Sequence, residues 1–243
     1  MKRLPFLAMA IAGALLATGC ATVNKKMNAE HLALANQAPS RTVAGGAYAP
    51  MPWAVGQWAL YAVRYEDVWS KQWVGLVGEA GGAHWLEVET YDPTDSKGPA
   101  RIRMQVKGYN AADLTSVKRL QIGTVITQNG SGKAMQAPPF IGPLTSGWAL
   151  AGFNIDTKGA TRSDAAVPAG TFTGASKIRT ETSLGPIEVV ADTWLHQAVP
   201  IWGIAQSKST DGDHEQRLID FGTSGAKSRI VGPVLGGTRA FGL

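Results

Sequence analysis

The sequence contains a single cysteine, Cys20, so the chain cannot form an internal disulfide. Its four histidines, His31, His84, His196 and His214, are far apart, and none has the His-x3-His spacing of a metal site. The chain also lacks the Gly-x-Ser-x-Gly pattern of a serine-hydrolase elbow. These absences argue against a metal centre and against a serine or cysteine nucleophile, and we expect no cofactor.

Charged residues are few, at 17% of the chain, and form no Lys/Arg cluster of the kind that binds nucleic acid. Without Lys2 and Arg3 the 23 basic residues fall to 21, which exceed the 18 acidic ones by only three. We therefore expect no nucleic-acid partner. Long apolar runs are also missing, because the stretch Leu4–Leu16 is too short to span a bilayer as a helix.

The N-terminal segment has the layout of a cleaved export signal, with Lys2–Arg3 before the apolar stretch and small residues before Cys20. Residues 16–20, Leu-Ala-Thr-Gly-Cys, resemble the lipobox of bacterial lipoproteins, with Ala17 where leucine is most usual. The resemblance implies a diacylglyceryl thioether on Cys20, cleavage before it and acylation of the new N-terminus. An ordinary secretory signal with an incidental cysteine is the alternative.

Ala21 follows the cysteine, at the place where the best-known sorting rule has an aspartate in lipoproteins retained at the inner membrane. The resemblance therefore implies a lipoprotein of the Gram-negative outer membrane that faces the periplasm. The predicted divisions are a signal peptide at 1–19, a lipidated N-terminus and tether at 20–55, and one β-rich domain at 56–243.

Residues 21–36 predict a short helix capped by Asn24. From Gly56 onward the hydrophobic period changes to two, which predicts β-strands. Residues 109–118 are interpreted as a brief helical crossover, and residues 138–166, which lack a period, as a long connection. The expected strands are 58–65, 72–78, 84–91, 101–107, 119–127, 133–137, 175–182, 186–195, 203–209 and 215–221, with a last edge segment at 230–235.

One antiparallel register satisfies both faces of three consecutive predicted strands. When Glu89 faces Arg101, Glu87 faces Arg103 in the same register. We therefore predict an antiparallel meander with one charged, solvent-exposed face and one apolar face. The apolar face is the candidate ligand-binding surface, and its residues are Val74, Leu76, Leu86, Val88, Ile102, Met104 and Val106.

The second half of the chain contains Val167-Pro-Ala-Gly-Thr-Phe172, then Asp192-Thr-Trp-Leu195 and Val199-Pro-Ile-Trp-Gly-Ile204. This series resembles the second half of periplasmic proteins with the LolA/LolB-like half-barrel and of lipoproteins related to them. The resemblance covers about residues 56–230. It implies a mainly β fold in which a curved antiparallel sheet forms an unclosed barrel, with short helices or loops over the concave face. In the lipoprotein-carrier members the cavity holds acyl chains, and no catalytic residues carry over.

Two sequence features resemble parts of enzyme active sites, but we do not interpret either as catalytic. Residues 129–133, Asn-Gly-Ser-Gly-Lys, lack the first glycine and the final Ser/Thr of a phosphate loop and predict a hairpin turn. Glu87 and Glu89 lie roughly 7 Å apart along a strand, near the carboxylate spacing of an inverting glycosidase. The facing arginines, however, would keep both acids ionised, whereas that reaction needs one protonated acid.

The sequence thus favours a non-enzymatic envelope lipoprotein that binds a lipid, an acyl chain or another lipoprotein on its apolar concave face. A structural or protein-interaction module of the envelope is the alternative, and a cell-wall hydrolase is a remote one.

Replacing Cys20 with alanine tests the lipid anchor. Because Cys20 is the only site for the thioether, the variant should lose all labelling by a radioactive fatty acid and should keep its signal peptide. The control Thr18→Ala keeps the cysteine and should be labelled like the parent. Labelling of the Cys20→Ala protein at the parent level would show that lipid is attached elsewhere in the chain, and a parent protein without label would show that no lipid is attached.

Overall fold

The computed structural model describes residues 23–46, 48–112, 120–138, 159–184 and 187–236. Within these ranges one helix and thirteen strands are present. No helix in this part of the chain is long and apolar enough to cross a membrane. The elements are α2 (Lys25–Ala35), β1 (Thr42–Val43), β2 (Trp58–Tyr65), β3 (Val68–Ala80), β4 (Ala83–Tyr91), β5 (Ala100–Lys107), β6 (Gln121–Asn129), β7 (Ala134–Gln136), β8 (Thr161–Val167), β9 (Gly170–Leu184), β10 (Ile187–Leu195), β11 (Ile204–Ser209), β12 (His214–Gly222) and β13 (Val234–Leu235).

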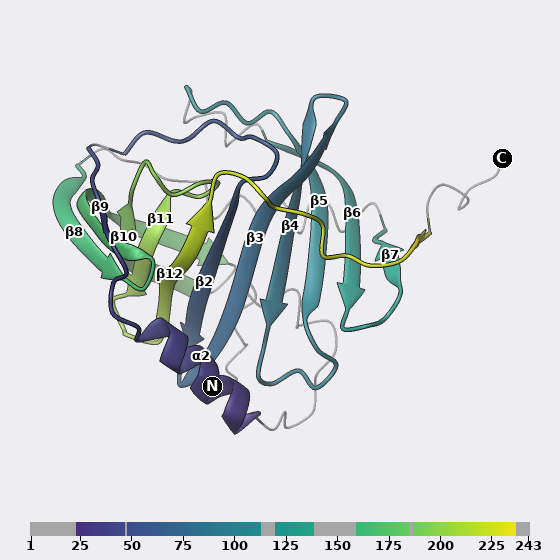
Figure 1. Cartoon of the computed structure of the whole chain (residues 1–243), viewed down its shortest axis with the longest axis horizontal. Helices are drawn as coiled ribbons and strands as arrows, with labels where there is room; N and C mark the ends of the chain where they lie inside the picture. Colours follow the sequence, from purple (N-terminus) through teal and green to yellow (C-terminus); the bar gives the residue numbers. More distant parts are fainter. Residues whose placement is uncertain (1–22, 47, 113–119, 139–158, 185–186, 237–243) are drawn as a thin grey trace.

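All the strands belong to one sheet that is not closed, in the order β1-β9-β10-β11-β12-β2-β3-β4-β5-β6-β7-β13, with β8 paired to β9 (Figure 1). The two halves of the chain meet where β12 pairs antiparallel with β2. Apolar side chains from both halves form one buried cluster, so the sheet curves until the two halves face each other. The predicted fold class, an unclosed and mainly antiparallel β-sheet, is confirmed.

The predicted meander register is also confirmed. β3, β4 and β5 are consecutive antiparallel neighbours, and Gly81 and Gly82 form a two-residue turn with φ of +59° and +70°. Positive φ at both central positions is the geometry of a type I′ hairpin. Paired residues of the three strands form rows on each face of the sheet. One face, here called the inner face, carries the rows Val74–Val88–Ile102 and Leu76–Leu86–Met104. The other, the outer face, carries the pairs Glu87–Arg103 and Glu89–Arg101.

Two strands lie outside the predicted set. All of β8 except its last residue lies within residues 138–166, which were expected to have no period. It pairs with β9 through small and polar residues. β1 has only two residues and pairs parallel with β9. Residues 113–119 and 139–158 lie outside the described residues, and with them most of the predicted crossover at 109–118 and of the predicted long connection at 138–166.

The helix predicted after Cys20 is confirmed as α2. Asn24 caps it, since its side-chain oxygen accepts a hydrogen bond from the Met27 amide at 3.1 Å. The helix packs on the outer face, where the Asn28 side chain accepts from the Trp69 amide at 2.6 Å and the His31 ring contacts the Trp69 carbonyl at 3.0 Å. With β1 in the sheet as well, the described part of the predicted tether differs from an extended spacer, because it packs against the sheet.

A C-terminal strap, defined as residues 224–231, crosses the outer face from β2 to β6 (Figure 1). Its backbone is tied at both ends. The Ala226 amide donates to the Gly56 carbonyl at 2.8 Å. The Gln128 side chain accepts from the Val231 amide at 3.1 Å and donates to its carbonyl at 2.9 Å. Beyond the strap, β13 pairs parallel with β7.

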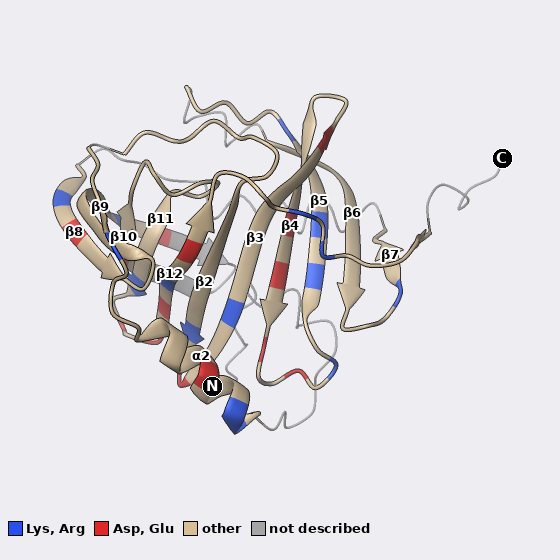
Figure 2. Cartoon of the chain, in the orientation of Figure 1, with Lys and Arg blue, Asp and Glu red and all other residues tan. Residues whose placement is uncertain are grey.

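The strap seals a charged row that was expected to be solvent-exposed. Glu87 accepts from the Ser228 hydroxyl at 2.8 Å and the Arg229 amide at 2.6 Å, while Glu89 pairs with Arg101 at 2.7 Å and with the Arg229 guanidinium. The two carboxylates are 0% and 1% exposed, so the predicted solvent-exposed outer face is wrong at these residues. Figure 2 shows the acidic bands of β4 beside the basic bands of β5.

Arg103 also differs in detail from the prediction. It lies opposite Glu87 in the register, but its guanidinium donates to the Ser228 hydroxyl at 3.2 Å and stacks over Trp85. The strap therefore takes the place of the expected Glu87–Arg103 pair, and Ser228 bridges the two side chains.

Replacing Glu89 with alanine tests this buried network. The change leaves Arg101 and Arg229 without their carboxylate in a covered site, so the free energy of unfolding should fall by about 3 kcal/mol or more. The control Glu79→Ala removes a carboxylate that is half exposed and should change it by less than about 0.5 kcal/mol. Urea unfolding curves measure both, and similar small losses would contradict the buried pairing.

Candidate functional site: the inner face of the sheet

The seven residues predicted to form the ligand-binding surface share the inner face and one apolar cluster. They come from β3, β4 and β5 and stand in paired rows, so the sheet register alone brings them together. Each is buried. Their exposed fractions are 0% for Val74, 0% for Leu76, 0% for Leu86, 3% for Val88, 5% for Ile102, 0% for Met104 and 2% for Val106.

The second half of the chain contributes the opposite wall of this cluster, which the sequence-based site omitted. Phe172 and Leu195 are fully buried there, and Ile178 and Ile204 are nearly so. The alternating pattern of strands 175–182 and 186–195 was a usable signal, but sequence alone did not place that half against the first. The inner face is therefore a surface made by both halves of the sheet.

Aromatic side chains from separate loops and from β2 gather along the same cluster. Trp53 stacks on Tyr109 with ring centroids 4.3 Å apart, and the Tyr109 hydroxyl donates to the Met51 carbonyl at 3.1 Å. Tyr61 of β2 stacks with Trp202 at 5.9 Å. Burial raises the pKa of Tyr109 to about 12 and raises the pKa of Tyr61 further, so both rings stay neutral phenols.

Polar side chains enter the inner face on β12, β2 and β3. Gln72 is opposite Tyr61, and Gln216 lies opposite Val63 and Ser207. The Tyr61 hydroxyl, one amide atom of Gln72 and one of Gln216 are buried without a hydrogen-bond partner among the described residues. A buried polar group of this kind costs about 1–3 kcal/mol, so these atoms need an explanation.

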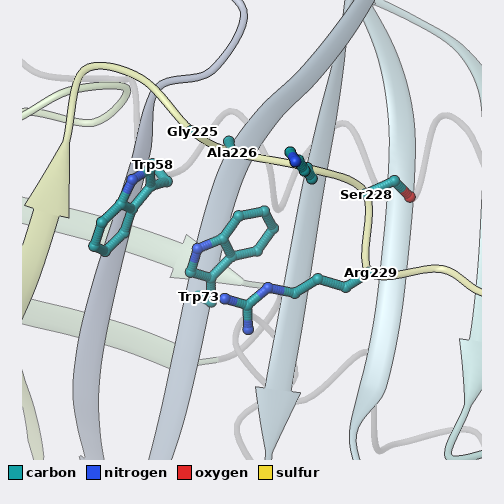
Figure 3. A pocket seen from close by; sticks show the side chains of 7 residues that line it. Trp58, Trp73, Gly225, Ala226, Ser228 and Arg229 are labelled. Carbon is teal, nitrogen blue, oxygen red and sulfur yellow. The ribbon is translucent and has the colours of Figure 1, made fainter.

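The outer face carries a separate pocket of about 390 Å³ under the strap (Figure 3). Trp58 and Trp73 form its wall, with strap residues 225–229 across it. Trp73 lies flat because Gly75 has no side chain, since a Cβ there would be 2.3 Å from the ring. The Arg229 guanidinium lies 4.1 Å from the Trp73 ring centre and is already paired with Glu89. The Arg229 guanidinium therefore already holds the strap to the sheet through its ion pair with Glu89.

The other candidate sites, for catalysis, metal binding or phosphate binding, have less support. Glu87 and Glu89, the pair with glycosidase-like spacing, are both bonded to the strap and covered by it. Within the part of the chain that the structure describes, no group of three or more His, Cys, Asp or Glu side chains is arranged to hold a metal ion. Residues 129–132 form the turn between β6 and β7, as the hairpin interpretation predicted.

His214, at the start of β12, predicts a pH dependence of folding. Burial lowers the pKa of His214 from 6.5 to about 4. Between those values the unfolded chain binds a proton that the folded chain does not, so stability falls as the pH falls, by at most about 3 kcal/mol. His214→Gln should flatten this slope in urea unfolding measured across the window. An unchanged slope would show that His214 is not buried as a neutral ring.

Comparisons with known proteins yield no family model and no curated protein that matches the sequence. Among solved structures, the hypothetical protein CT021 from Chlamydia trachomatis is similar with a TM-score of 0.41 and 10% identity, over 74% of this chain and 93% of that one. MucB has a TM-score of 0.35 and 9% identity, over 85% of this chain and 62% of its own. A candidate lipoprotein from Parabacteroides distasonis has a TM-score of 0.30 and 11% identity, over 71% and 97%. At these low values the likenesses carry no argument about function, and they do not show membership of the LolA/LolB-like family.

Proposed function

We propose that this chain is a non-enzymatic lipoprotein of the bacterial envelope, anchored to the outer membrane through Cys20, whose inner sheet face binds an acyl chain of a lipid or of another lipoprotein. The observation that carries the binding part is the Tyr61 hydroxyl. It lies fully buried in an apolar cluster that both halves of the sheet share, without a protein partner among the described residues. A closed protein core normally satisfies such a group, whereas a binding interior leaves it for a ligand.

The position of Asn24 supports the anchoring part. The Asn24 amide donates to the Pro93 carbonyl, in the β4–β5 connection, at 2.8 Å. Only three residues lie between Cys20 and Asn24. A fully extended chain over those four Cα–Cα steps reaches at most about 14 Å. A lipid on Cys20 would therefore hold the β4–β5 end of the sheet close to the membrane surface, so that a ligand has a short path between bilayer and sheet.

The alternative of a protein-interaction module rests on the outer pocket beside Trp58 and Trp73. Aromatic side chains that border a pocket are common anchors for a partner protein. The outer face, however, is already covered by α2 at one end and by the strap at the other. The pocket under the strap is a small surface for a stable protein partner, so we favour the inner face.

Lipid extraction from the purified full chain tests the proposal. The parent should carry acyl lipid beyond what is covalently attached to Cys20, as measured by mass spectrometry. Val88→Trp adds bulk to the inner face and should lower the bound lipid at least fivefold, while circular dichroism reports whether the sheet survives the added volume.

The control Val55→Trp makes the same change at a half-exposed position and should keep the lipid. If Val88→Trp fails to fold, Ile102→Phe is a smaller change on the same face. A parent protein that carries no extractable lipid, or two inner-face variants that keep all of it, would contradict binding on this face.

A further inference from the structure

Three buried polar atoms on adjacent strands lie at one end of the inner face. They are the Tyr61 hydroxyl on β2, Oε1 of Gln72 on β3 and Nε2 of Gln216 on β12, and none has a hydrogen-bond partner among the described residues. The three residues are 0%, 2% and 3% exposed. Tyr61 and Gln72 are directly opposite each other, so their Cβ atoms lie about 5 Å apart. Gln216 lies on β12, the other neighbour of β2, and is diagonally adjacent to Tyr61.

The chemistry of these atoms is complementary to an uncharged polar group. A phenol donates and accepts, and each glutamine amide offers one oxygen acceptor and one nitrogen donor. A hydroxyl or an amide N–H donates to an acceptor such as Oε1 of Gln72, whereas an ester only accepts, here from the Tyr61 hydroxyl and from Nε2 of Gln216. The unpartnered atoms therefore supply what the first polar group at the root of an acyl chain would need.

A charged group fits this place poorly. The positions of β12, β2 and β3 that share the inner face here are occupied by neutral residues: Gln216, Leu218, Tyr61, Val63, Gln72 and Val74. The charges on the same strands point outward, where Glu215 pairs with Arg217 at 2.7 Å and lies 3.6 Å from Arg64. His214 is next on the inner face, and burial lowers its pKa so that the ring is neutral near pH 7. A carboxylate or phosphate would be buried there without a counter-ion from these three strands, which is costly.

We propose that Tyr61, Gln72 and Gln216 form the polar end of the interior site and bind the uncharged ester, amide or hydroxyl group of an acyl-bearing molecule, in preference to a carboxylate or phosphate. The acyl chain extends from this end along the apolar rows of β3, β4 and β5. This inference rests on the proposed function, since it assigns the ligand class to the same site. Both a glyceride and the diacylglyceryl-cysteine of another lipoprotein carry such an ester.

The test uses the full chain purified in digitonin, a detergent without an acyl chain. Native mass spectrometry measures binding of monooleoylglycerol, of a synthetic diacylglyceryl-cysteine peptide, and of oleate at a mildly alkaline pH where its carboxylate is ionised. The parent should bind one or both esters at least tenfold more tightly than oleate. The ester that binds more tightly identifies the source, a free glyceride or a lipoprotein.

Tyr61→Phe removes one polar atom, Gln72→Met removes both polar atoms of the amide, and each nearly keeps the side-chain shape. Each should weaken ester binding roughly threefold to tenfold and leave oleate binding unchanged. Tyr61→Phe should not lower the urea midpoint, because it removes only an unpartnered polar atom from a buried site. The control Tyr91→Phe removes a hydroxyl on the outer face and should not alter lipid binding.

The outcomes separate the two claims. A parent that binds none of the probes overturns the proposed function and the ligand class together. A parent that binds oleate as tightly as the esters, or Tyr61→Phe and Gln72→Met variants that bind esters like the parent, overturns the ligand class and leaves acyl binding in place. If both variants lose stability with unchanged ester binding, the polar atoms hold structural water and the assignment is wrong.

Discussion

The structure depends on one register across β3, β4 and β5. With Leu86 opposite Leu76 and Met104, the carboxylates of Glu87 and Glu89 must point to the other face, toward the arginines of β5. A slip by one residue would exchange the two faces and would bury two carboxylates in the apolar cluster, at a cost of several kcal/mol each. The same constraint leaves the inner face apolar along its centre, so the separation of charge and apolar surface is a single property of these strands.

The C-terminal strap makes this separation complete. Ser228 and Arg229 contact Glu87, more than 140 residues away in the chain, and close the outer face over charges that would otherwise meet solvent. α2 covers the same face at its other end through Trp69. Both covers known from the described residues therefore lie on the outer side, where they leave a small pocket. The inner face holds the unpartnered Tyr61 hydroxyl and the unpartnered amide atoms of Gln72 and Gln216, which are the reason we place the ligand there.

The sequence alone predicted the features that depend on the alternation of apolar and polar residues along a strand. The register of β3, β4 and β5 followed because one pairing satisfied charges on one face and apolar residues on the other, and the Asn24 cap followed from local chemistry. β8 was missed because its small and polar residues show no apolar period. The strap was missed because its contacts join Ser228 and Arg229 to strands far away in sequence. Gln72 looked like an ordinary polar strand position, and only its burial opposite Tyr61 shows otherwise.

The most direct test of the account asks which face of one strand touches lipid. Trp58 and Tyr61 both lie on β2, but on the outer and inner faces respectively. Each is replaced in turn by a diazirine-bearing phenylalanine, and the full chain is illuminated in its own membranes before the mass of any adduct is measured. The account predicts acyl-lipid adducts at position 61 and few or none at position 58. Equal lipid labelling at both positions, or lipid labelling at position 58 alone, would contradict it.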